Sequence, residues 1–189
     1  PYSMILNKTN FFLSLKNNFL FENNPSIAVG VSGGPDSLAL IYLMNIWIKS
    51  QKGNLVALII DHKLRLESYG ESKATKDYLA NLNIKSKIIR VSDKKLKKRN
   101  MNEARNNRYD KLINYCTKNH ILHLFLGHHF DDNIETFLIR KIAGSNIEGL
   151  NAMSFSSIRK NIHIVRPLLN FDKKQIINFK EINKLNFIQ

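Results

Sequence analysis

The chain is poor in the residues that stabilise small secreted or metal-bound scaffolds. Its 189 residues include one cysteine and only four prolines. A single cysteine cannot form an internal disulfide, and multi-cysteine zinc sites and iron–sulfur clusters need more thiolates. The sequence also lacks an apolar run of the roughly 18 to 20 residues that a membrane-spanning helix requires. These absences exclude a disulfide-rich secreted domain and predict a cytoplasmic protein without a membrane segment.

Acidic residues are scarce relative to basic ones. Lys and Arg number 29 against 15 Asp and Glu, which gives a formal net charge of +14. Such an excess favours a polyanionic partner, and nucleic acid is the first candidate because its phosphates attract Lys and Arg. A general compositional bias toward Lys, Asn and Ile is the alternative explanation. Charge alone therefore does not decide the partner.

Short apolar segments rich in β-branched residues alternate with helical patterns along the chain. The strands that this pattern predicts are 27–31, 55–60, 87–91, 122–126 and 163–165. The predicted helices are 4–24, 38–48, 71–83, 101–119, 131–142 and 172–183. This rhythm is typical of βαβ units with right-handed crossovers. It predicts an α/β fold with three layers, α/β/α, around a mostly parallel five-stranded sheet.

We expect residues 1–24 to be a tag remnant followed by a helix, and residues 25–189 to form the main domain. Parallel sheets of this kind bind ligands at the carboxyl ends of their strands. The unusual polar residues of the sequence follow three of these predicted strand ends. The functional site is therefore expected at that edge of the sheet.

The first predicted strand runs into a glycine-containing turn and then a helix. Its residues are Ser32, Gly33, Gly34, Pro35, Asp36 and Ser37. Glycines let the backbone approach a ligand closely, and the free N–H groups at a helix start bind phosphate. Asp36 does not fit a simple phosphate site, because a carboxylate repels phosphate unless a cation intervenes, so we expect it to face Mg²⁺. The alternative is a tight turn in which Asp36 only caps the helix.

The common nucleotide-binding loops are absent. The sequence has neither a Gly-x-x-x-x-Gly-Lys-Ser/Thr loop nor a Gly-x-Gly-x-x-Gly fingerprint. The segment Ser32 to Ser37 instead resembles the PP-loop of the ATP pyrophosphatases. Members of that superfamily cleave ATP between its α- and β-phosphates and adenylate a substrate oxygen. The resemblance implies ATP binding by Ser32 to Ser37 and leaves the second substrate open.

Further segments carry polar residues in a characteristic order. They are Asp61-His62-x-Leu64-Arg65, Glu103-Ala104-Arg105-x-x-Arg108-Tyr109, Gly127-His128-His129-x-Asp131-Asp132-x-x-Glu135-Thr136, and Gly144-Ser145-x-Ile147-x-Gly149-Leu150 followed by Arg166-Pro167-Leu168-Leu169. Together they resemble the tRNA(Ile)-lysidine synthetase family over residues 25–188. The family normally continues into a tRNA-binding C-terminal region, so we expect this chain to be the isolated N-terminal catalytic domain.

Arg105 and Arg108 share one face of a predicted helix, because they are three residues apart. Paired arginines suit phosphate, since they are always charged and fork-shaped. We expect Arg105 to bind the nucleotide and Arg108 to be catalytic, with an ion-paired helix face as the alternative. The basic run 94–99 either contacts tRNA phosphates or is a solvated loop.

The strand-end pair His128 and His129 leads into an acidic helix start. Consecutive side chains leaving a strand point to opposite sides, so we expect at most one of the two histidines to reach the ligand directly. We assign His128 and Asp132 to the catalytic site, where they orient lysine or accept its proton. Asp131 is equally well explained by the favourable field at a helix N-terminus. A metal site made of these histidines and aspartates stays open as an alternative.

The family resemblance implies a ligase that forms a carbon–nitrogen bond. Its substrates would be ATP, free L-lysine and the wobble cytidine of tRNA(Ile) with a CAU anticodon, with Mg²⁺ as cofactor. A homodimer is compatible with the sequence. The alternatives are a PP-loop tRNA thiolase, an amidating synthetase, and a non-catalytic ATP- or RNA-binding module. The thiolase is disfavoured because Cys116 alone cannot supply the several cysteines that such enzymes usually carry.

Overall fold

Six strands form one sheet in the order β3-β2-β1-β4-β6-β5. The computed structural model describes residues 5–61, 68–91, 101–135 and 153–185. The strands are β1 (Ser26–Val31), β2 (Asn54–Asp61), β3 (Ser86–Arg90), β4 (His123–Phe125), β5 (Ser156–Arg159) and β6 (Ile162–Val165). β1 pairs in parallel with both β2 and β4, and the pairs β2–β3 and β4–β6 are also parallel. The prediction of a mostly parallel sheet is confirmed.

The sixth strand is the one that the sequence did not predict. β5 pairs with β6 in an antiparallel hairpin whose two loop residues are Lys160 and Asn161. Both have positive φ, 50° and 63°, as a tight hairpin turn of the primed type requires. The common signature of such a turn is Asn-Gly or Asp-Gly, so Lys-Asn gives a weak signal. The polar residues Ser156 and Ser157 also hide the alternation typical of a strand.

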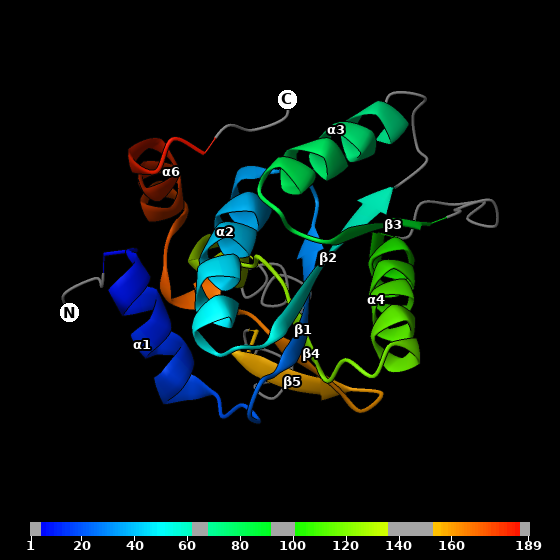
Figure 1. The fold of residues 1–189 in the computed structure, drawn as a ribbon, viewed down its shortest axis with the longest axis horizontal. Helices are drawn as coiled ribbons and strands as arrows, with labels where there is room; N and C mark the ends of the chain where they lie inside the picture. Colours follow the sequence, from blue (N-terminus) through cyan, green and yellow to red (C-terminus); the bar gives the residue numbers. More distant parts are fainter. Residues whose placement is uncertain (1–4, 62–67, 92–100, 136–152, 186–189) are drawn as a thin grey trace.

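Helices cover both faces of the sheet (Figure 1). They are α1 (Lys8–Asn18), α2 (Pro35–Ser50), α3 (Ser68–Asn81), α4 (Met101–Lys118), the 3₁₀ helix η2 (Pro167–Asn170) and α6 (Lys173–Ile182). One hydrophobic cluster joins α1, α2, α3 and α6 to the sheet, and a second joins α4 to the opposite face. The three-layer α/β/α arrangement is therefore confirmed.

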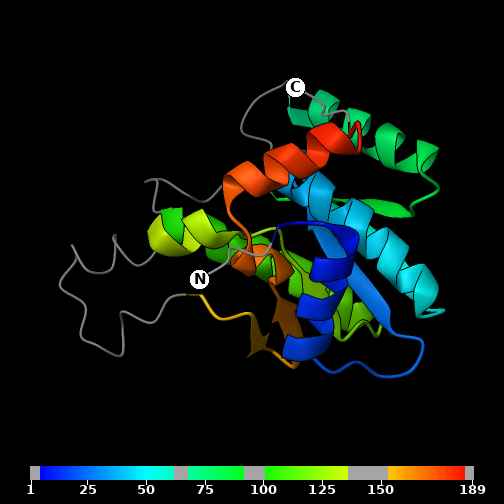
Figure 2. The same ribbon diagram turned by 90° about the vertical axis from the view of Figure 1, so that its left-hand side faces the viewer.

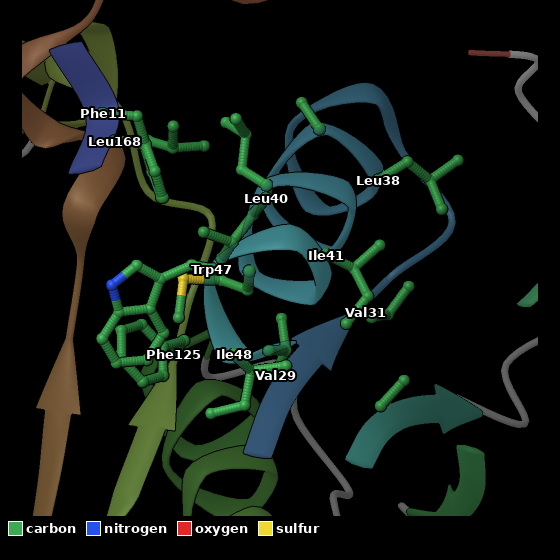
Figure 3. Close-up of a cluster of buried hydrophobic side chains, with 14 of the residues drawn as sticks. Phe11, Val29, Val31, Leu38, Leu40, Ile41, Trp47, Ile48, Phe125 and Leu168 are labelled. Carbon is green, nitrogen blue, oxygen red and sulfur yellow. The ribbon is translucent and has the colours of Figure 1, made fainter. Parts of the chain in front are cut away.

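Helix α2 lies at the centre of the larger cluster. Its buried side chains include Leu38, Leu40, Ile41 and Trp47, which contact the sheet on one side and the helices α1 and α6 on the other (Figure 3). Figure 2 shows α6 lying alongside α2. Burying an aliphatic side chain of this size stabilises the fold by about 1.5–3 kcal/mol. The apolar character of α2 thus reflects its burial by the sheet and by the neighbouring helices α1 and α6.

The opening helix is shorter than predicted. The sequence suggested residues 4–24, whereas α1 spans Lys8–Asn18. Asn7 caps its start by accepting the backbone N–H of Asn10 at 2.8 Å. The chain becomes extended at Phe19, whose ring packs edge-on against His123 and His163. These aromatic contacts need an extended backbone, which explains why the helical pattern ends early.

The other predicted elements agree with the structure to within a few residues. The helix predicted over 131–142 is confirmed for residues 130–135, and the rest lies outside the described part. Within the described residues, no helix has the length and apolar character needed to cross a bilayer. The strand order places β1 between β2 and β4, so the chain leaves β1 on one side and returns on the other. Ligand sites of open α/β sheets form at such a switch point.

Candidate active site

The turn between β1 and α2 has the backbone of an anion-binding loop. Gly33 has φ +85°, a conformation that side-chain-bearing residues rarely adopt. Ser37 Oγ accepts the backbone N–H of Ser32 at 3.1 Å and donates to the Gly34 carbonyl at 3.0 Å. Gly34 caps α2 without a side-chain hydrogen bond, and Pro35 occupies the first turn. The N–H groups of that turn, with the positive end of the helix dipole, can therefore receive an anion.

A cavity of about 220 Å³ opens beside this loop. It is lined by Gly30, Val31, Ser32, Asp36, Ser37, Ile60, Arg108, Tyr109, Leu112, Leu126, Gly127 and His128. The aliphatic side chains of Ile60, Leu112 and Leu126 suit a flat apolar group such as a base. The polar side chains of Asp36, Arg108 and His128 suit phosphate and its counter-ions. The structure thus brings together residues from the ends of β1, β2 and β4 and from α4.

The loops after β1 and β4 touch one another. A Cβ atom built on Gly127 would lie 3.2 Å from the carbonyl carbon of Asp36 and 3.2 Å from the amide nitrogen of Ser37. Contacts this short leave little room for a side chain against a backbone. Glycine at position 127 therefore lets the second loop pack directly against the phosphate loop.

Asp36 forms an ion pair that the sequence did not suggest. Both of its carboxylate oxygens accept hydrogen bonds from Lys173 Nζ, each at 2.6 Å. Lys173 is the first residue of α6 and is 137 residues away in the chain. The one available signal was positional, because this helix start follows β6 and therefore lies at the same sheet edge as the phosphate loop.

Asp36 also fits the predicted role at Mg²⁺. Asp36 is one of the residues that line the cavity, and its carboxylate binds a cation in the structure, namely the Lys173 ammonium. Mg²⁺ is commonly held by one or two carboxylates together with substrate phosphates and water. In the described part of the chain, no group of three or more His, Cys, Asp or Glu residues is arranged to hold a metal ion. The alternative of a metal site built from both histidines and both aspartates is therefore not supported.

His128 and His129 point in different directions, as predicted. His128 lines the cavity, whereas the buried ring of His129 lies among three carboxylates. His129 Nε2 is 3.8 Å from Asp36 Oδ2 and 3.5 Å from Asp132 Oδ2, and Nδ1 is 3.5 Å from Asp131 Oδ2. Asp132 Oδ2 also accepts the backbone N–H of His129 at 2.9 Å. Asp132 therefore lies close to the phosphate loop, with the His129 ring between them.

Asp131 lies at the start of the helix after β4, but its side chain contacts the start of α6. Its Oδ2 atom accepts the backbone N–H of Lys173 at 2.7 Å. That N–H is one of the first-turn donors of α6, which have no partner within the helix. Asp172 and Gln175 satisfy two further donors there in a reciprocal capping box. Asp131 thus joins the segment after β4 to α6, and a structural role explains it.

Arg108 lines the cavity, beside Tyr109. Helix α4, which carries both, is held by the β5–β6 hairpin. Arg159 Nη2 and Lys160 Nζ donate to Asp110 Oδ1 at 3.1 and 3.0 Å, and the Arg159 guanidinium lies 5.6 Å from the centre of the Tyr109 ring. The hydrogen bond from Lys160, assisted by the charge of Arg159, holds the pKa of Asp110 below its ordinary value.

Several predicted residues lie outside the described part of the chain. The side chains of Glu103 and Arg105 are among them, and so are His62, Arg65 and the ranges 94–99 and 144–150. The nucleotide-binding role given to Arg105 therefore stays a prediction. Arg108 and His128 line the cavity, and Asp132 lies beside His129. The catalytic roles given to these three residues stay predictions.

Comparison with known proteins gives a consistent picture. The sequence matches the family described as the PP-loop domain over residues 7–189. It is 38% identical over 180 residues to the tRNA(Ile)-lysidine synthase of Wolbachia pipientis wMel, covering 94% of this chain and 42% of that protein. The tRNA(Ile)-lysidine synthase of Orientia tsutsugamushi (strain Boryong) is 35% identical over 181 residues, covering 96% and 41%. The chain therefore spans less than half the length of these curated relatives.

A solved structure shares the fold. The U34-tRNA thiolase of Methanococcus maripaludis, determined with its [4Fe-4S] cluster, superimposes with a TM-score of 0.80 at 20% sequence identity. The match covers 96% of this chain and 65% of the thiolase. At this identity the likeness concerns the arrangement of helices and strands alone.

Proposed function

Because the chain belongs to the PP-loop domain family, we propose that it is the ATP-using catalytic domain of a tRNA(Ile)-lysidine synthase. The observation that carries the proposal is the cavity in which the phosphate loop, Arg108 and His128 meet. Its aliphatic wall suits adenine and its polar end suits the triphosphate. The identity of 35–38% to tRNA(Ile)-lysidine synthases supports the choice of substrate within the family.

The first step of the proposed reaction is adenylation of the tRNA. The C2 carbonyl oxygen of the wobble cytidine attacks the α-phosphorus of ATP, and the bond to the β-phosphate breaks to release pyrophosphate. Negative charge grows on the leaving pyrophosphate, so hydrogen-bond donors fixed around it lower the barrier. The first-turn N–H groups of α2 and the guanidinium of Arg108 are donors of this kind. Arg105 is proposed to add a second guanidinium.

The second step is attack by lysine. The neutral ε-amine adds to C2 of the adenylated cytidine, the C2–O bond breaks, and AMP leaves with the oxygen. Only the neutral amine is nucleophilic, so a nearby group must accept a proton from the ammonium form. We assign this task to His128, which lines the cavity, and the binding of the ammonium to Asp132. The three carboxylates around His129 make this region favourable for a cation.

Mg²⁺ is proposed to be held by Asp36 together with the phosphates of ATP. When bound, the ion supplies positive charge that offsets the charge on the leaving pyrophosphate. The chain itself contributes the carboxylate that binds this cation and the helix start that receives the phosphates. Both belong to the turn between β1 and α2.

The single cysteine argues against the thiolase alternative. Cys116 is fully buried on the inner face of α4, and this burial raises the pKa of its thiol to about 12. A protonated, inaccessible thiol cannot carry sulfur. A single cysteine is also too few to supply the several thiolate ligands of a [4Fe–4S] cluster. Within this chain, the shared fold with a thiolase is therefore not accompanied by the cysteines of that chemistry.

The proposal is tested by measuring pyrophosphate release and the incorporation of radiolabelled lysine into tRNA. We expect pyrophosphate release that requires both ATP and tRNA(Ile) with a CAU anticodon, and lysine incorporation that requires all three substrates. A tRNA with another anticodon is the matched control. ATP binding without turnover in the presence of all substrates would identify a binding module instead.

Three further points belong to the same proposal. The substrate tRNA places the reaction in the cytoplasm. The positive charge of the chain suits the anticodon arm of that tRNA, and the relevant contacts are expected to weaken as salt rises. A homodimer is also proposed, and light scattering of the purified chain would measure it.

A further inference from the structure

Lys173 forms an ion pair with Asp36, the residue proposed to bind Mg²⁺. Its Nζ atom lies 2.6 Å from both oxygens of Asp36, and the two side chains are about one-third and one-quarter exposed. A symmetric contact of this kind neutralises the carboxylate before any ligand binds. Lys173 therefore occupies the position at which a cation must stand if phosphate is to enter beside Asp36.

The backbone of Lys173 is fixed independently of its side chain. Asp131 accepts its N–H at 2.7 Å, and the capping box of Asp172 and Gln175 fixes the same helix turn. The ammonium can therefore leave Asp36 by rotation of its own side chain, without movement of α6. Lysine has four rotatable side-chain bonds and three donors, so it can exchange one anionic partner for another.

From this geometry we propose that Lys173 is a polyphosphate-binding residue that Asp36 holds until ATP arrives. In ATP the β- and γ-phosphates offer a denser negative charge than one carboxylate, and Asp36 would be the residue that holds Mg²⁺ when the ion is bound. The ammonium then pairs with the terminal phosphates. This inference rests on the proposed function in so far as ATP is taken to be the ligand of the cavity.

The exchange gives the site a means of distinguishing ATP from AMP. AMP lacks the terminal phosphates, so Lys173 gains nothing by leaving Asp36 when AMP is bound. The residue therefore contributes to the affinity for ATP and for pyrophosphate, and not to the affinity for AMP. After pyrophosphate has left, Lys173 returns to Asp36 and AMP is held only by the rest of the cavity.

The experiment compares three ligands with four proteins by calorimetry, using the 189-residue chain. The ligands are α,β-methylene-ATP with Mg²⁺, which cannot be cleaved at the reacting bond, pyrophosphate with Mg²⁺, and AMP. The proteins are the wild type, Lys173→Met, Lys173→Arg and the matched control Lys174→Met. The control removes the same charge from the exposed next residue of α6. Loss of one charge-assisted contact predicts that Lys173→Met binds the ATP analogue and pyrophosphate about 10- to 100-fold more weakly.

AMP binding by Lys173→Met is expected to stay within about twofold of the wild type, and Lys174→Met is expected to bind all three ligands normally. Lys173→Arg keeps the charge and should retain most of the affinity for the ATP analogue, which excludes loss of folding as the cause. Equal weakening of the ATP analogue and AMP, or unchanged binding of the ATP analogue, would overturn the inference. Failure of the wild type to bind either nucleotide would instead contradict the proposed function.

Discussion

Asp132 closes the first turn of its helix by accepting the backbone N–H of His129 at 2.9 Å. The same carboxylate is the one proposed to bind the ammonium of the lysine substrate. A substitution that removes the whole side chain would therefore disturb both the helix start and the proposed lysine site. Separating the two roles requires a residue that keeps the acceptor oxygen and loses the charge.

Asp132→Asn is that substitution, and Asp132→Ala is its comparison. We expect Asp132→Asn to raise the KM for lysine about 10- to 100-fold, because a hydrogen bond to a charged group is lost, while the melting temperature stays unchanged. Asp132→Ala should do the same to KM and also lose about 1 kcal/mol of stability. At this chain length that loss lowers the melting temperature by about 2–4 °C. Unchanged KM in Asp132→Asn would remove the residue from the lysine site.

Asp36→Asn should affect activity far more than stability. We expect ATP–pyrophosphate exchange in the presence of tRNA to fall by about 100-fold or more, because the charge that balances the phosphates and their cation is lost. The ion pair with Lys173 is partly exposed, so its loss should change the free energy of unfolding by less than about 1 kcal/mol. Exchange at the wild-type rate would contradict the role given to Asp36.

Cys116 should be inert in the folded protein. Its burial and its raised pKa, about 12, keep the thiol protonated at ordinary pH. We expect no reaction with a thiol-specific chromogenic reagent in native buffer and one equivalent of reaction after unfolding in guanidinium chloride. The variant Cys116→Ala should retain lysine incorporation, whereas a sulfur-carrying role would abolish it.

Two glycines should respond to alanine in opposite ways. A Cβ on Gly53 would lie 2.2 Å from the Pro25 carbonyl oxygen, so Gly53→Ala forces the backbone apart and should cost about 1–3 kcal/mol. Nothing lies within 4 Å of a Cβ on Gly70, which is exposed in α3, so Gly70→Ala should stabilise by about 0.5 kcal/mol. Thermal unfolding of both variants measures the difference. Equal effects would mean that the turn at Gly53 relaxes freely.

The pair formed by Glu22 and His123 makes stability depend on pH. Partial burial would raise the pKa of the Glu22 carboxyl, but the hydrogen bond with His123 and backbone N–H groups outweigh it, so the pKa lies below its ordinary value of 4.5. A lowered pKa stabilises the folded state above pH 4.5, and this contribution is lost as the pH falls through the folded value. The stability difference between wild type and Glu22→Gln should therefore shrink below pH 4.5. Urea unfolding at a series of pH values tests this, and a constant difference would contradict it.

The sequence predicted the parts of the fold that rest on periodicity. The buried strand before Ser32 and the helices of α2 and α6 appear where apolar spacing and capping residues put them. It missed β5, because the pairing of an edge strand depends on its neighbour more than on its own residues. It also extended α1 too far, because the packing of Phe19 on two histidines is a tertiary contact.

The same difference between local patterns and long-range contacts explains which site residues were predicted. Residues whose chemistry follows from a local motif, such as Asp36 in its loop, were identified and lie at the cavity. Lys173 was missed because its importance comes from an ion pair across 137 positions. The structural role of Asp131 was likewise hidden, since the N–H that it accepts belongs to another helix.

Two of the described strands, β3 and β5, form the outer edges of the sheet, and both carry positive charge. Lys87 and Arg90 lie exposed on β3, Arg159 is the last residue of β5, and Lys160 follows it in the hairpin turn. Charged side chains on an edge strand oppose its pairing with the edge of a second molecule, which is the first step of sheet aggregation. Part of the net charge of +14 thus opposes edge-to-edge pairing between the sheets of two molecules.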